Sequence, residues 1–309
     1  MTVGVLLMTY GAPRNDADLP AYLARVRGGR VPDDALVAEM RRRYARIGGS
    51  PLVRITEAQA RALEAELGLG FRVRAGMRYS DPTIADRVHE LGEVERVVGI
   101  VMSPQWSALL MRGYVDALRV ASATPAAVVG AWHREPTFVA ALAAQLRAAH
   151  ERLPGAPVLL TAHSLPRRVF DAEPEYVAQL KETGRLVAAA AGLRPAEWEW
   201  AYQSAGHTQE EWLRPDLKER FPAIAAAGHR DVLVAPVQFL ADHLEVLYDL
   251  DVAAADEATS ANLRYHRVAM PNCDPAFIGA LADVVRGALV EAAASRPSVP
   301  NGSTGWPSL

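Results

Sequence analysis

The sequence predicts an α/β protein made of two similar domains with mainly parallel sheets, which face each other across a shared cleft. Three observations predict this class. Short β-rich runs alternate with long stretches of helical period, as expected for successive βα units. A pair of motifs recurs in the two halves of the chain, and the turn-forming stretch PGAP (154–157) separates those halves.

The predicted strands are short runs dominated by apolar and β-branched residues. They span 3–8, 71–77, 96–102, 126–132, 156–162, 197–203 and 231–237. The stretches between them have apolar residues at helical spacing and predict helices such as 54–67 and 135–152. The last stretch, 295–309, is rich in Ser, Pro and Gly and predicts a disordered tail.

The internal repeat aligns VLLMTYGAP (5–13) with VLLTAHSLP (158–166) without a gap, so that Tyr10 falls opposite His163. Two buried strands can resemble each other by chance. However, a second strand–loop–helix motif follows in each half, in the same order. The repeat predicts domains at 1–153 and 154–294, with a last helix at about 274–294 that can pack across both. Ligands of parallel sheets bind beyond the carboxyl ends of the strands, which are expected to face the cleft.

Composition excludes several classes of function. The formal charge of −3 gives no overall basic field for a nucleic acid partner. A single cysteine, Cys273, excludes an intrachain disulfide and a four-cysteine metal or cluster site. The N-terminal segment lacks a basic region and a long apolar run. We therefore expect a cytoplasmic protein with no integral membrane segment.

Two polar motifs follow apolar strands and are candidates for chemistry. His163 is either a hydrogen-bonded turn residue or a base that faces the cleft. In ADHLE (241–245), Asp242 and Glu245 have the spacing of a helix capping box, but a carboxylate that meets an imidazole in a cleft can also bind a metal or exchange protons. Asp249, four residues after Glu245, fits either an ion path or an ordinary solvated helix face.

The first half is dense in arginines, which suit a clamp for carboxylates if some of them face the cleft. RIGGSP (46–51) is too short for a phosphate-binding loop, and no G-x-G-x-x-G follows a strand. A dinucleotide cofactor is therefore not expected.

Six motifs together resemble the bacterial ferrochelatases, in order, from the N-terminus to about residue 290. They are TYGAP, RYARIGGSPL, TAHSLP, YQSAGHTQEEWLRPD, ADHLEVLYDLD and AMPNCDPAFI. The resemblance implies two Rossmann-like, doubly wound domains related by a pseudo-repeat, with an active-site cleft between them. It also implies insertion of Fe²⁺ into a porphyrin, with release of two protons, in haem biosynthesis. His163 and Glu245 match the catalytic residues, which would also bind the Fe²⁺.

The form of the TYGAP motif resembles the enzymes of Gram-positive-type bacteria, which convert coproporphyrin III to coprohaem. This resemblance implies that Tyr10 binds the substrate and acts as axial ligand of the product iron. Other positions match contacts to the substrate propionates: Arg27, Arg43, Ser50, Tyr114 and Ser204. Asp249 matches an acidic position that forms an outer metal site in the family. The position where that row of acidic residues would continue is occupied here by Ala253, which has no carboxylate. Cys273 stands without the cysteine set that holds an iron–sulfur cluster in some relatives, so no cluster is expected.

The resemblance implies no organic cofactor, with Fe²⁺ and the porphyrin as substrates. We expect a monomer that makes transient contacts with the enzymes acting before and after it. Three alternatives remain open at this stage: a protoporphyrin IX ferrochelatase, a cobalt or nickel chelatase for sirohydrochlorin, and a non-catalytic haem carrier with Tyr10 as ligand.

Overall fold

The computed structural model describes residues 2–206 and 210–294 and contains two four-stranded parallel sheets with the same strand order. The first sheet, in the order β2-β1-β3-β4, consists of β1 (Val3–Thr9), β2 (Phe71–Met77), β3 (Arg96–Val101) and β4 (Ala126–Val128). The second, in the order β6-β5-β7-β8, consists of β5 (Val158–His163), β6 (Trp198–Gln203), β7 (Asp231–Pro236) and β8 (Arg264–Arg267). The predicted α/β class and its repeat are confirmed.

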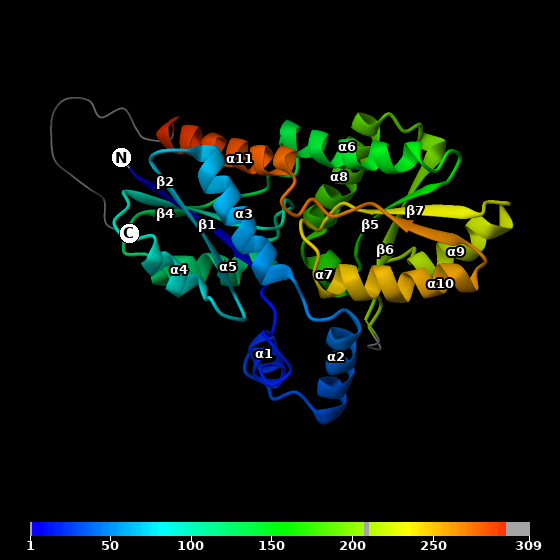
Figure 1. The fold of residues 1–309 in the computed structure, drawn as a ribbon, viewed down its shortest axis with the longest axis horizontal. Coiled ribbons are helices and arrows are strands. Elements are labelled where there is room, and N and C mark those ends of the chain that lie inside the picture. The colour runs from blue at the N-terminus through cyan, green and yellow to red at the C-terminus, as the bar shows by residue number, and fades with distance from the viewer. Residues whose placement is uncertain (1, 207–209, 295–309) are drawn as a thin grey trace.

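The helices of the first half cover both faces of its sheet and add a projecting pair (Figure 1). They are α1 (Leu19–Val26), α2 (Asp34–Arg46), α3 (Leu52–Leu67), α4 (Ile84–Glu90) and α5 (Ala108–Ala121). In Figure 1, α4 and α5 lie below the sheet and α3 above it, whereas α1 and α2 hang below the space between the two sheets. Apolar side chains of α1 pack against those of α2, and Tyr44 is among the residues of this small cluster.

One helix that belongs to the first half by sequence, α6 (Pro136–Glu151), packs against the second half. The second half itself has the corresponding helices and one unusual segment. The bounds are α7 (Arg167–Ala172), α8 (Pro174–Ala191), the short 3₁₀ helix η1 (Pro195–Glu197), α9 (Leu217–Ala226), the π-helix η2 (Glu245–Ala254), α10 (Ala255–Ser260) and α11 (Pro275–Ala294). A π-helix of ten residues is uncommon and is found mostly at functional sites. No helix in the described part of the chain is long and apolar enough to cross a membrane.

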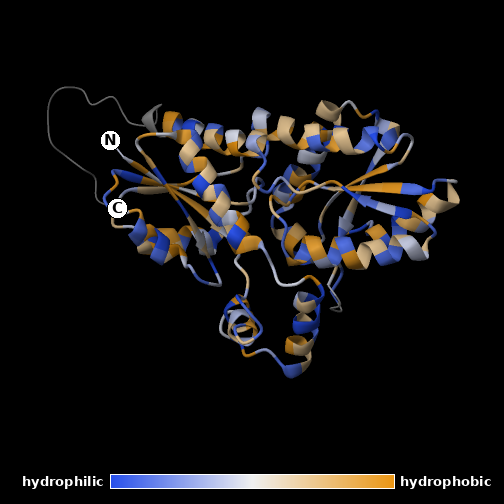
Figure 2. Cartoon of the chain, viewed as in Figure 1, coloured by the Kyte–Doolittle hydropathy of each residue, from blue (hydrophilic) through white to orange (hydrophobic). Residues whose placement is uncertain are grey.

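One apolar core runs through both halves. Its members include Val5 and Leu7 of β1, Leu160 of β5, Phe138 of α6 and Phe277 of α11, all of them buried. Such strands, buried on both faces, are continuous hydrophobic runs, and Figure 2 shows the orange residues concentrated along them. α6 packs against α8 and β7 of the second half, whereas α11 packs against α3 of the first and against α6. The domain boundary at 153/154 therefore remains a proposal. α6 and α11 both make contacts across it.

Two strands differ from those predicted. The strand predicted at 126–132 ends at Val128, because the chain then leaves the sheet and the Trp132 N–H donates to the Pro104 carbonyl. β8 was not predicted, since its sequence RYHR has no apolar run. It is an edge strand whose neighbour is β7, so little of its surface needs to be apolar. The predicted tail, 295–309, lies outside the described residues.

Candidate active site

The carboxyl ends of β1 and β5 open into one cavity of about 680 Å³ between the two halves. Tyr10 directly follows β1, and His163 is the last residue of β5. The cavity is lined by five of the residues predicted from sequence: Tyr10, Ser50, Tyr114, His163 and Glu245. The structure thus brings residues from both halves together at the place where parallel sheets bind ligands.

His163 directs one ring nitrogen toward Glu245 at the edge of this cavity. Its Nδ1 lies 2.5 Å from the Ser164 carbonyl oxygen, and because a carbonyl only accepts, Nδ1 is the donor of that bond and Nε2 is left to face Glu245. The backbone N–H of His163 donates to Oε1 of Gln238 at 2.8 Å, and the Gln238 amide in turn donates to the buried Tyr176 hydroxyl. These bonds fix the imidazole at the strand end.

Glu245 lies between two imidazoles. Its Oε2 atom is 3.8 Å from Nε2 of His163 and 3.8 Å from Nε2 of His243. His243 also has its Nδ1 on a backbone carbonyl, that of Ala241, at 2.9 Å. The sequence analysis did not single out His243, although ADHLE contains it. Three proton-exchanging groups therefore meet at one edge of the cavity.

Charge interactions keep Glu245 ionised. Burial by itself would raise the pKa of its carboxyl, but the neighbouring His163 and His243 outweigh burial and hold that pKa at about 2. Burial would lower the pKa of His243, yet the Glu245 carboxylate raises it above the ordinary value. The cluster therefore contains a carboxylate and an imidazole that readily takes a proton.

The capping-box interpretation of ADHLE is wrong. η2 begins at Glu245 after Leu244, and no side chain caps its N-terminus. Asp242 does not cap η2 but contacts Asn272, whose Oδ1 accepts from the Asp242 N–H and whose Nδ2 donates to the Asp242 carboxylate. Glu245 is thus free to face the cavity.

Tyr10 approaches the same cavity from the first half. Its ring packs edge to face on Tyr79, with centroids 4.6 Å apart, and 43% of the residue is exposed. The Arg78 guanidinium stacks over the rings of Tyr79 and Tyr114. Burial raises the pKa of Tyr10, and Arg78 works in the opposite direction. Tyr10 can therefore present its oxygen to a ligand in the cavity.

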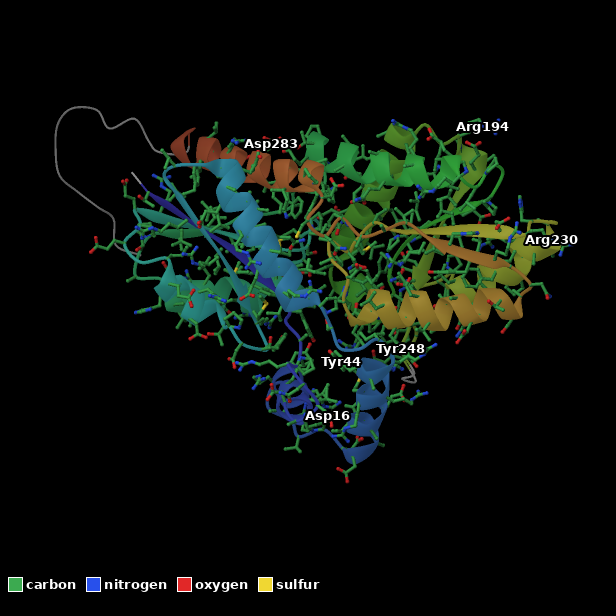
Figure 3. All side chains as sticks on the ribbon, in the orientation of Figure 1. Asp16, Tyr44, Arg194, Arg230, Tyr248 and Asp283 are labelled. Atoms are coloured by element: carbon green, nitrogen blue, oxygen red, sulfur yellow. The ribbon has the colours of Figure 1, made fainter. Side chains whose placement is uncertain are left out.

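Four predicted residues do not line the cavity: Arg27, Arg43, Ser204 and Asp249. Arg27 is exposed just after α1. Arg43 donates to Glu39 at 2.7 Å, comes within 3.5 Å of Asp249 and stacks over Tyr248, where α2 meets η2 (Figure 3). Ser204 follows β6 with a φ of 61°, and its buried hydroxyl has no hydrogen-bond partner among the described residues.

We expect Mg²⁺ to bind weakly or not at all at Asp249. A hard cation needs several oxygen ligands, but Ala253, four residues after Asp249, supplies none. The guanidinium of Arg43 also lies beside the Asp249 carboxylate. Calorimetry with Mg²⁺ should show no stoichiometric binding, and added Mg²⁺ should change turnover little. Tight binding that disappears in Asp249→Ala would contradict this expectation.

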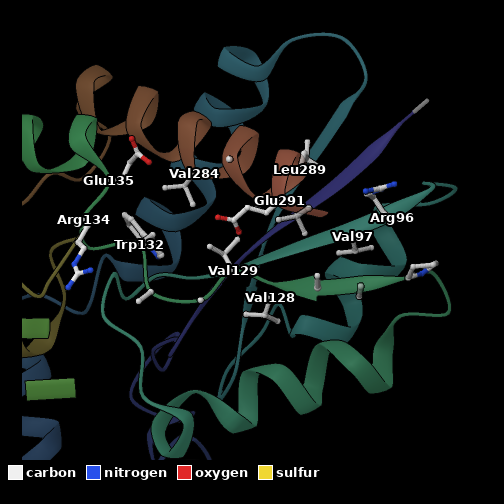
Figure 4. A pocket seen from close by; sticks show the side chains of 18 of the residues that line it. Arg96, Val97, Val128, Val129, Trp132, Arg134, Glu135, Val284, Leu289 and Glu291 are labelled. Carbon is white, nitrogen blue, oxygen red and sulfur yellow. The ribbon is translucent and has the colours of Figure 1, made fainter. Parts of the chain in front are cut away.

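A second cavity, of about 760 Å³, lies away from these residues at the edge of the first sheet. It is bounded by β4 and α11, and Figure 4 shows Val97, Val129, Trp132 and Val284 around it. Its labelled charged side chains include Arg96, Arg134 and Glu291. It brings together none of the predicted site residues.

Comparisons with known proteins identify relatives over most of the chain. The chain matches the family model described as Ferrochelatase over residues 2–289. It is 38% identical to "Ferrochelatase" of Deinococcus radiodurans, across 94% of this chain and 97% of that protein. It is 36% identical to "Coproporphyrin III ferrochelatase" of Geobacillus kaustophilus, across 92% and 95% respectively. Among solved structures, SirB from Bacillus subtilis with Fe³⁺ has a TM-score of 0.62 at 12% identity, over 96% of this chain and 98% of that one. That likeness shows the fold alone.

Proposed function

Since the chain belongs to the ferrochelatase family, lyases that insert Fe²⁺ into a porphyrin, we propose that it acts on coproporphyrin III and that His163 and Glu245 carry the chemistry. The observation that carries the proposal is the cluster of Nε2 of His163 and Oε2 of Glu245, 3.8 Å apart, on a cavity that Tyr10 also lines. We also propose that the reaction uses no organic cofactor and no iron–sulfur cluster.

The reaction exchanges one Fe²⁺ for the two protons of the pyrrole N–H groups, so bases must stand at the metal-binding face. His163 offers its Nε2, and Glu245 offers a carboxylate whose pKa is lowered. Both groups are also ligands that Fe²⁺ accepts, which lets them take the ion from its waters. His243 can carry a proton away from Glu245, because its pKa is raised by that carboxylate. Tyr10 would supply an oxygen as axial ligand of the product iron.

Two observations support coproporphyrin III as the substrate. The relative from Geobacillus kaustophilus is named for that porphyrin. Coproporphyrin III has four propionates where protoporphyrin IX has two, and a buried carboxylate without a partner is costly. The cavity and its rim offer basic side chains, Arg78 within and Arg43 at the contact of α2 with η2.

Turnover of the purified protein with Fe²⁺, measured anaerobically by absorbance on the two porphyrins side by side, tests the proposal. We expect clear preference for coproporphyrin III. Preference for protoporphyrin IX would overturn the substrate assignment. Binding of iron coproporphyrin without any synthesis of it would identify a carrier, and turnover of sirohydrochlorin with cobalt or nickel would identify the other chelatase class.

We expect Arg43→Leu to lower the preference for coproporphyrin III, because one propionate loses a charge-assisted partner. Such a bond contributes roughly 1.5–3 kcal/mol, so the ratio of kcat/KM values for the two porphyrins should fall about 10- to 100-fold. Arg42→Leu is the matched control, since Arg42 is on the same helix and also donates to Glu39, but 67% of its side chain is exposed, against 24% for Arg43. An equal effect of both substitutions would contradict a specific role of Arg43.

A further inference from the structure

The segment that carries Asp242 and His243 and leads directly to Glu245 has no regular structure of its own. Residues 237–243 connect β7 to Leu244 and η2 without a helix or strand. Their conformation must therefore come from contacts with other parts of the chain. This matters for the chemistry, because catalytic groups need to be held within about half an ångström of their working positions.

Asn272 supplies three of those contacts. Its side chain accepts from the Asp242 N–H at 2.9 Å and donates to the Asp242 carboxylate at 2.8 Å. Its own N–H donates to the Leu240 carbonyl at 3.1 Å. Asn272 thus pairs with two alternate residues of the irregular segment, much as a neighbouring strand would.

The backbone of Asn272 is in an unusual conformation that permits this pairing. Its φ is 46°, in the left-handed region that few residues other than glycine adopt and that asparagine tolerates best. Such a conformation persists only where surrounding contacts impose it, and it is concentrated at functional sites. Here it directs both the side chain and the backbone N–H toward residues 240–242.

Gln59 joins this arrangement to the first half of the molecule. It is a fully buried side chain of α3, and its Nε2 donates to the Asn272 carbonyl at 2.8 Å and to the Leu240 carbonyl at 3.3 Å. In Figure 1 the orange segment after β8 crosses the middle of the molecule on its way to α11, which brings Asn272 to α3. The polar bonds of Gln59 therefore tie the two halves together beside the cavity.

Arg267 holds the other side of the same segment. Its guanidinium binds Asp251 of η2 with two bonds, of 2.5 and 2.8 Å, and lies 3.5 Å from Asp242. Only 13% of its side chain is exposed. In the sequence, Asp242 precedes Glu245 and Asp251 follows it, so Arg267 contacts the chain on both sides of Glu245.

We propose that Asn272 is a positioning residue that, with Gln59 and Arg267, holds Glu245 opposite His163. The position of Glu245 then depends on the contact between the two halves. The inference rests on the proposed function in assigning Glu245 to proton transfer. It adds that the base pair is positioned by Asn272 and Arg267, which do not line the cavity, together with Gln59, which does.

Asn272→Gly tests the proposal, because glycine keeps the left-handed backbone and removes only the side-chain bonds. Loss of a partner that orients a ligating group lowers activity about 10- to 100-fold. We expect kcat to fall by that factor, with KM for the porphyrin and the affinity for the free porphyrin unchanged. Asn262→Gly is the matched control: its φ is 63°, and it lies at the turn before β8, away from the cavity. It should leave kcat at the wild-type value.

A double substitution separates positioning from general stability. If Asn272 acts through Glu245, adding Asn272→Gly to the Glu245→Gln variant should not lower the rate of single-turnover insertion any further. Additive losses, or wild-type kcat in Asn272→Gly, would overturn the proposal. If Asn272→Gly does not fold, Asn272→Asp takes its place, since it keeps the acceptor to the Asp242 N–H and loses the donor to the carboxylate.

The choice of porphyrin keeps this test independent of the substrate assignment. Because Asn272 acts on the base and not on the propionates, kcat should fall by the same factor with coproporphyrin III and with protoporphyrin IX. A wild-type protein that inserts iron into neither would defeat the proposed function. An active wild type with an equally active Asn272→Gly would defeat the inference alone.

Discussion

His163→Ala is expected to remove nearly all iron insertion while the protein stays folded and still binds porphyrin. The imidazole presents Nε2 at the cavity, and a positioned base contributes about 10²- to 10⁴-fold to a proton-transfer step. The side chain is 26% exposed at the end of β5, so its removal leaves the buried clusters around that strand in place. Anaerobic turnover, porphyrin affinity and the melting temperature are the three measurements.

The matched control is His89→Ala, which removes an exposed imidazole near the end of α4. It should have wild-type turnover. If His163→Ala also turned over at the wild-type rate, the assignment of His163 as catalytic would be wrong. Loss of porphyrin binding together with turnover would instead indicate that His163 shapes the cavity.

Glu245→Gln is expected to lower iron insertion about 100-fold or more with almost no change in melting temperature. Glutamine has nearly the same shape but cannot accept a pyrrole proton or bind Fe²⁺ as an anion. It also removes the charge that raises the pKa of His243, so the neighbouring imidazole takes up a proton less readily. Both effects act on the same step, and neither removes a cap from η2, because no side chain caps it.

Glu66→Gln, which changes an exposed carboxylate on α3, is the control for Glu245→Gln. A Glu245→Gln variant with normal turnover and a lowered melting temperature would assign Glu245 to helix stability. Turnover and thermal unfolding measured on one preparation decide between the two roles.

The fold could be predicted from sequence where burial leaves a simple pattern. β1 and β5 are covered on both faces, so they consist of continuous apolar residues such as Leu6 and Leu159. β8 escaped prediction for the opposite reason, since an edge strand can be polar. The ten-residue π-helix also has no signature in a single sequence. Its i→i+5 bonds arise from the tertiary contacts of Glu245 and Asp251, and local propensity does not specify them.

The site could be predicted in part. A histidine at a strand end and a carboxylate after another strand were sufficient to nominate His163 and Glu245, whose closeness the structure then shows. The place of Arg43 could not be predicted, because it depends on how α2 approaches η2. The capping-box spacing of ADHLE was misleading, since Asn272, thirty residues further along the chain, satisfies Asp242.

The packing of α6 and α11 bears on whether each of the two repeated halves can fold without the other. α6 follows the last strand of the first sheet but packs with α8, whereas α11 follows the last strand of the second sheet but packs with α3. Each half by itself would therefore lack one of the helices that shield its sheet. We expect that the unit repeated in strand order is not a unit of folding. Chain halves separated at this point would have to associate before either could exclude water from its core.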